Sequence, residues 1–247
     1  MEVLMPKDFN LENSLKFCEL LDELEYDEIY EYNYKNMSTV EPFGMLIIGS
    51  KIRKFKMEKN KSYHTNSNYE RNGYAGHMGY FKSIGVDFGK KPGEANGNDN
   101  YIPLTVENVN EVYHKLYFDK AYEGYLGLND YIERNIATAL ANVISRKDKV
   151  IKDNLTFCIS ELIRNVFEHS KSKDIWYSGQ YWPQKDLVEI SILDEGTGIT
   201  ESLRRNKKIE FSGDEEALKL CVEPGVTKAI LNGKKLPKRI IRDLDFI

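Results

Sequence analysis

Two long amphipathic segments followed by a β-hairpin restrict the fold of this chain more than any other feature. Segments 129–147 and 153–170 carry apolar residues at helical spacing. Stretches 174–182 and 187–194 are rich in β-branched and aromatic residues and are joined by the turn P-Q-K-D. Two helices next to two antiparallel strands predict a layer of helices on a small sheet.

The N-terminal half alternates strand-like and helix-like segments, which predicts a small α/β domain. We expect this domain to span residues 1–120, a linker at 117–128, and a second domain over 125–247. After a polar loop at 58–72, a short helix at 74–85 precedes a further strand. The strands and longer helices predicted here are a strand within 1–5, a helix over 11–24, a strand over 28–34, a helix over 42–56 and a strand over 101–106.

Composition and the N-terminal sequence predict a cytoplasmic protein. The net charge of −4 gives no indication of nucleic acid as a partner. The sequence contains no apolar run of the roughly 18 residues that a membrane span needs. M-E-V-L-M-P-K lacks the basic and apolar regions of a signal peptide. Cys18, Cys158 and Cys221 are widely spaced, and we expect them to be buried thiols in a reducing compartment.

The helix over 153–170 carries two neighbouring stripes. Glu161, Asn165 and His169 follow one another at steps of four residues, which places them in one row. The predicted core stripe lies beside this row and consists of Leu155, Ile159, Leu162 and Val166. A polar row beside a buried stripe is typical of the wall of a cavity, and the alternative interpretation is an ordinary solvated helix face.

The strand over 187–194 leads directly into the loop D-E-G-T-G. Asp194 has the same period-two alternation as Ile190 and Ile192, so its carboxylate is expected on the same face as their apolar side chains. A carboxylate in that place accepts a hydrogen bond from an amine. Gly196 and Gly198 allow a ligand to approach the backbone where a Cβ would block it. An ordinary D-x-G turn is the alternative.

Together, E-L-I-R-N-V-F-E-H-S and D-E-G-T-G-I resemble the N box and first glycine box of the GHKL family of ATP-binding domains. That family includes gyrase, heat-shock chaperones, MutL and histidine kinases. The resemblance covers residues 125 to about 230 and implies an α+β two-layer sandwich that binds ATP and magnesium. It makes Asn165 the magnesium ligand and Glu161 the catalytic position that activates water or a hydroxyl. His169 is expected either to contact phosphate or to cap the helix.

In the glycine loop, the same resemblance implies that Asp194 binds the adenine amine. It also implies that Gly196 and Gly198 let the nucleotide lie close to the backbone. The family's second glycine box, G-x-G-x-G, does not follow in this sequence, where the later glycines are isolated. The chain is therefore either truncated or carries an incomplete nucleotide site, and truncation is our expectation.

The segment E-I-Y-E-Y-N-Y-K-N-M-S-T-V-E-P-F-G-M-L-I-I-G-S-K-I-R-K-F in the N-terminal half resembles STAS domains, an α/β fold of anti-sigma-factor antagonists. In STAS switch proteins the turn before the helix reads Asp-Ser-Ser/Thr-Gly and is phosphorylated. Here that turn is Glu41-Pro42-Phe43-Gly44, with Ser38 and Thr39 nearby. The resemblance therefore implies binding to a protein partner or homodimerisation, without phosphorylation in this turn.

The sequence leaves two functions open. The first is a cytoplasmic regulatory protein that binds Mg-ATP and either hydrolyses it or transfers phosphate to a protein serine. The alternative is a non-catalytic interaction or signalling module with a degenerate or truncated ATPase fold. Glu161, Asn165 and Asp194 favour the first function, and the missing second glycine box favours the second.

Overall fold

The computed structural model of this chain describes residues 1–118, 124–146, 148–206 and 209–221. Its helices and strands confirm the predicted α/β class. The strands of the described residues form two three-stranded sheets and one two-stranded sheet. The basic stretch G-K-K-L-P-K-R-I-I-R at 233–242 lies outside the described residues.

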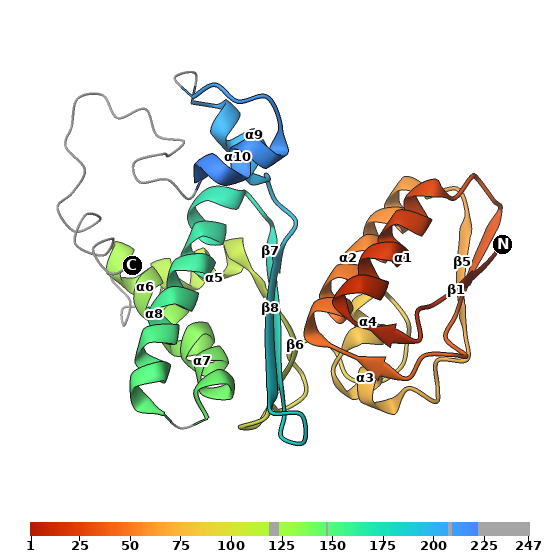
Figure 1. Cartoon of the computed structure of the whole chain (residues 1–247), viewed down its shortest axis with the longest axis horizontal. Helices are drawn as coiled ribbons and strands as arrows, with labels where there is room; N and C mark the ends of the chain where they lie inside the picture. The colour runs from red at the N-terminus through yellow and green to blue at the C-terminus, as the bar shows by residue number, and fades with distance from the viewer. Residues whose placement is uncertain (119–123, 147, 207–208, 222–247) are drawn as a thin grey trace.

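The N-terminal half follows the strand–helix alternation predicted from its sequence. Its elements are β1 (Glu2–Leu4), β2 (Asp8–Phe9), α1 (Leu11–Glu23), β3 (Ile29–Asn33), β4 (Thr39–Val40), α2 (Pro42–Glu58) and β5 (Tyr63–Ser67). Strands β1, β3 and β5 are parallel and lie in that order, and β2 pairs with β4. Helices α1 and α2 cover one face of the larger sheet (Figure 1).

The structure contradicts the prediction of a loop over 58–72, because β5 lies within it. The residues of β5 are mostly polar, so the strand has a weak sequence signal. It is stabilised by its pairing with β3 and by the ring of His64. This ring stacks on Tyr30 at 5.5 Å and on Tyr32 at 6.1 Å between centroids. Tertiary contacts thus determine the conformation of this strand.

Two short helices, α3 (Gly73–His77) and α4 (Tyr80–Ser83), replace the single helix predicted over 74–85. Gly79 separates them, because its φ of 93° lies in the left-handed region and interrupts a right-handed helix. Buried Tyr80 and Phe81 then point into the aromatic core of the N-terminal half.

The C-terminal half is a layer of helices on an antiparallel sheet, as the sequence predicted. The elements of this half are β6 (Tyr101–Asn108), α5 (Val109–Phe118), α6 (Gly124–Ile132), η1 (Glu133–Ala137), α7 (Thr138–Ser145), α8 (Lys149–Asn165), η2 (Val166–Ser170), β7 (Asp174–Trp182), β8 (Leu187–Asp194), α9 (Ile199–Arg204) and α10 (Asp214–Cys221). Both η segments are π-helical turns that continue a neighbouring α-helix. The hairpin strands β7 and β8 have the predicted bounds.

The sheet order β6-β7-β8 corrects the assignment of two segments. Strand β6 was assigned to the domain over 1–120, but it pairs with β7 and belongs to the second sheet. The predicted linker over 117–128 also includes the end of α5 and the start of α6, while residues 119–123 lie outside the described residues. The boundary at 120 therefore does not separate the two sheets.

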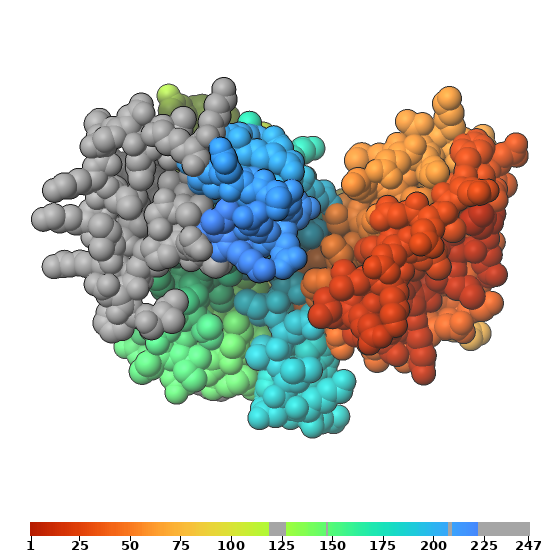
Figure 2. Space-filling model, turned by 45° about the horizontal axis from the view of Figure 1, so that its top comes forward, coloured from red at the N-terminus to blue at the C-terminus, as the bar shows by residue number. Residues whose placement is uncertain are grey.

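Helix α2 lies between the two large sheets (Figure 1). Helices α5 to α8 cover the opposite face of β6-β7-β8, so the layers run helix, sheet, helix, sheet. Trp176 of β7 is buried in the core of the N-terminal half, and Leu193 of β8 packs against the same core. Figure 2 shows the N-terminal half, red to orange, directly against the cyan part of the chain that contains β8.

Two backbone contacts fix the start of α2. The Phe43 N–H donates a hydrogen bond of 2.6 Å to Oε1 of Glu189, a residue of β8. A Cβ on Gly44 would lie 2.0 Å from the carbonyl oxygen of Phe9, so only glycine fits there. The pKa of Glu41, in the same turn, is raised mainly by burial and to a smaller extent by the nearby Glu189 carboxylate. The turn Glu41-Pro42-Phe43-Gly44, which stands at the position of the STAS phosphorylation turn but lacks its pattern, is thus part of the contact between the two halves.

The three cysteines are free thiols, but the prediction that they are buried is wrong. Cys158 is exposed, and Cys18 and Cys221 are half-buried. In the parts of the chain that the structure describes, every helix is too short or too polar to cross a membrane.

Candidate functional site

Helix α8 packs on the sheet through a stripe that differs from the predicted one at two positions, because Thr156 replaces the half-buried Leu155 and Ile163 replaces Leu162. Thr156, Ile159, Ile163 and Val166 are its buried residues, with Val166 in the continuing π-turn. Leu162, predicted in the core, is 57% exposed, whereas Ile163 is fully buried. Positions three and four residues after Ile159 both fit a helical stripe. Periodicity therefore could not decide between Leu162 and Ile163.

Because α8 buries Ile163 and not Leu162, Glu161 lies on the side of the helix away from the sheet. The prediction that Glu161 flanks the core stripe is therefore wrong. Glu161 is two residues from both Ile159 and Ile163, and two residues correspond to about 200° of helix rotation. Its carboxylate forms an ion pair with the guanidinium of Arg164 on the same helix. Nε of Arg164 also lies 3.8 Å from Oε1 of Glu168. Glu161 is thus a partly exposed, ion-paired carboxylate on the outer side of α8.

Asn165 and His169 are both exposed at the C-terminal end of the same helix. Asn165 is the last residue of α8, and Nε2 of His169 lies 3.8 Å from Oε2 of Glu168. The helix is terminated by Lys171 in the left-handed region and by Ser170, whose hydroxyl donates 2.8 Å to the Val166 carbonyl. The capping role expected as one alternative for His169 is therefore filled by its neighbours.

The prediction for the face of β8 holds up to the strand's last residue. Ile190 and Ile192 pack against the core under helices α7 and α8. Asp194 follows them in the alternation but is exposed, because the sheet ends there. Its Oδ1 accepts a hydrogen bond of 3.0 Å from the Gly196 N–H, which fixes the direction of the carboxylate.

The glycine loop and the end of the N-box-like helix are in direct contact. The Glu195 N–H donates 3.1 Å to the Ser172 hydroxyl, and the Thr197 N–H donates to the Ser170 carbonyl. A Cβ on Gly196 would lie only 2.2 Å from that same carbonyl oxygen. The close approach requires glycine at this position. The structure thus brings the two sequence motifs together at one end of the sheet.

Gly198 is not constrained in this way. It precedes α9 with φ of −63° and ψ of 165°, a conformation that any residue adopts. No described atom lies within 4 Å of a Cβ placed on it. Local packing therefore explains Gly196 but gives no reason for glycine at Gly198.

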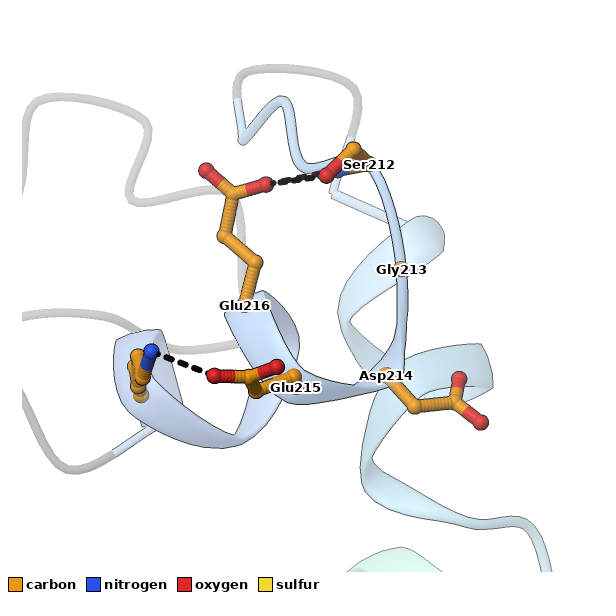
Figure 3. A pocket seen from close by; sticks show the side chains of 6 residues that line it. Ser212, Gly213, Asp214, Glu215 and Glu216 are labelled. Carbon is orange, nitrogen blue, oxygen red and sulfur yellow. Dashed lines mark hydrogen bonds and ion pairs between the residues drawn. The ribbon is translucent and has the colours of Figure 1, made fainter.

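A surface depression at the start of α10 is a poor site for a phosphate (Figure 3). Asp214, Glu215 and Glu216 line it, and negative side chains repel a polyphosphate. Both the N–H and the hydroxyl of Ser212 donate to Oε2 of Glu216, at 2.7 and 2.8 Å. Lys219 is paired with Glu215 at 2.6 Å. These contacts cap and stabilise the helix.

The residues around Asn165 suit magnesium only as part of a metal–nucleotide complex. Among the described residues, no group of three or more His, Cys, Asp or Glu side chains is arranged to hold a metal ion. Magnesium usually takes one or two protein ligands and completes its shell with phosphate oxygens and water. Asn165 is exposed and carries one amide oxygen, which fits that mode of binding.

Comparison of the chain with models of known protein families, with curated proteins and with solved structures finds no match.

Sequence reasoning missed the residues that link the elements around the site. Ser170 is the last residue of the N-box-like motif and Ser172 follows it, and serine at the end of a helix is a recognisable signal for side-chain bonds to the backbone. Glu189 bonds to the Phe43 N–H and Arg53 pairs with Glu195, so each links one half to the other. Their partners are more than 140 residues away in the sequence, so no local pattern identifies them.

Proposed function

We propose that this protein binds Mg-ATP at the end of α8 and the adjoining glycine loop, as a GHKL-type regulatory protein. One observation carries the proposal, namely the contact of the D-E-G-T-G loop with the residues that end the N-box-like helix. In this proposal Asn165 binds magnesium and Asp194 accepts a hydrogen bond from the adenine amine. His169 faces the phosphates, and the bare backbone at Gly198 lets the nucleotide lie close.

Binding is tested by calorimetry of Mg-ATP with the full chain and two variants. The wild-type chain is expected to bind in the micromolar range, and Asn165→Ala and Asp194→Asn are each expected to weaken binding at least about tenfold, since each removes one ligand contact. Asn154→Ala and Asp153→Asn are matched controls, because both residues are exposed earlier on the same helix. A folded wild-type chain that shows no binding would contradict the proposal.

Turnover requires a change at Glu161, whose carboxylate is paired with Arg164. The guanidinium occupies the carboxylate oxygen that would have to accept a proton, so catalysis would need this pair to open when nucleotide binds. We expect Glu161→Gln to retain Mg-ATP binding and to reduce phosphate release about a hundredfold. Glu168→Gln, which changes the other carboxylate near Arg164, should retain most of the activity. Equal loss in both variants would argue against Glu161 as the base.

The non-catalytic interaction module is the second candidate, and the open face of the N-terminal sheet favours it. Parallel sheets are usually covered on both faces. Here no described element covers the second face of β1-β3-β5 (Figure 1). Leu4, Ile29 and Tyr63 share this face by register and are 47%, 49% and 75% exposed. Nucleotide binding without phosphate release would favour a regulatory role in which a protein partner or a second copy covers this face.

A further inference from the structure

The N-terminal half contacts the candidate nucleotide loop through one arginine. Arg53 of α2 donates from Nη2 to Oε1 of Glu195 at 2.7 Å. Its guanidinium carbon also lies 4.1 Å from the ring centroid of Trp176 on β7. The side chains of Arg53 and Glu195 are 23% and 41% exposed, so water reaches this ion pair from the Glu195 side.

Glu195 is well placed to transmit this contact. It lies between Asp194 and Gly196, and its own N–H bonds to the Ser172 hydroxyl. The side chain of Glu195 is thus held from α2, and its backbone is held from the segment that follows α8. Such contacts from two sides restrict the backbone of the loop.

The helix that carries Arg53 is itself fixed against the sheet. Glu189 of β8 accepts the hydrogen bond of the Phe43 N–H near the first turn of α2. Trp176 of β7 and Leu193 of β8 are packed into the core of the N-terminal half, to which α2 belongs. Arg53 therefore extends from a rigid support, as a residue that positions a loop requires.

We propose that Arg53 is a positioning residue, which holds the D-E-G-T-G loop through Glu195 in the conformation that presents Asp194 to the nucleotide. The inference rests on the proposed Mg-ATP site. It makes the N-terminal half part of that site's support. A ligand or partner that displaces α2 would consequently alter the affinity for nucleotide.

The test compares Arg53→Gln, Arg53→Lys and Glu195→Gln with Lys54→Gln, which removes a charge next to Arg53 on the same helix. Hydrogen exchange of the Glu195, Gly196 and Thr197 amides in the full chain reports the order of the loop without any ligand. Calorimetry of Mg-ATP reports affinity. Arg53→Gln and Glu195→Gln should each speed exchange and weaken binding by about tenfold, through loss of the ion pair and, for Arg53, of the ring contact.

Arg53→Lys should change exchange and affinity less than Arg53→Gln does. Lysine keeps the positive charge but cannot stack a planar group on the Trp176 ring. Exchange and affinity in Arg53→Gln that equal those of Lys54→Gln would overturn the inference. If the wild-type chain binds no nucleotide, the proposed function fails. In that case faster exchange confined to the loop would still show positioning by Arg53, and unchanged exchange would refute it.

Discussion

Replacing Gly196 with alanine is expected to lower the free energy of unfolding by about 3 kcal/mol, because the new methyl group overlaps a backbone oxygen. The Cβ would lie 2.2 Å from the Ser170 carbonyl oxygen and 2.7 Å from the Ser172 nitrogen. Neither atom is the end of a flexible side chain, so the loop must move away from the helix. Chemical denaturation followed by circular dichroism measures the loss.

Gly198→Ala is the matched control for this prediction. No described atom lies within 4 Å of the added Cβ, so its stability should stay within about 0.5 kcal/mol of wild type. Its affinity for Mg-ATP should nevertheless fall, because in the proposed site the nucleotide lies against this backbone. An equal loss of stability in both variants would contradict the contact described for Gly196.

The second large effect is expected for Ile163→Ala, with a loss of about 2–5 kcal/mol in the free energy of unfolding. Ile163 is fully buried under α8 and lies in the core beside Ile159 and Phe167. Leu162→Ala removes a side chain of the same size that is 57% exposed, and it should cost less than about 1 kcal/mol. The reverse order would mean that α8 is rotated toward the stripe predicted from the sequence.

The hairpin and the main helices were predictable because their patterns are local. Strands β7 and β8 have strong β-forming residues on both sides of a polar turn, and the structure confirms their bounds. Strand β5 was missed because its sequence is polar and its stability comes from pairing with β3. The rotation of α8 was missed for a related reason. Leu162 and Ile163 are equally apolar, and only the surrounding core selects between them.

The candidate site was predictable as a set of motifs and not as a geometry. The neighbouring positions of the N-box-like helix and the glycine loop followed from their order in the sequence. The outward direction of Glu161 depends on which residue α8 buries, and the ion pair with Arg164 follows from that direction. Arg53 is separated from Glu195 by 142 residues, so no local sequence pattern links the two side chains.

The position of α2 between two sheets has a consequence for how this protein unfolds. Trp176 and Leu193 lie on the sheet of one half but are packed into the core of the other. Separating the halves would therefore expose the α2 side of the N-terminal half and the face of β6-β7-β8 that α2 covers, and both carry apolar side chains. The described body should therefore lose its structure as a single cooperative unit, with one thermal transition shared by both sheets.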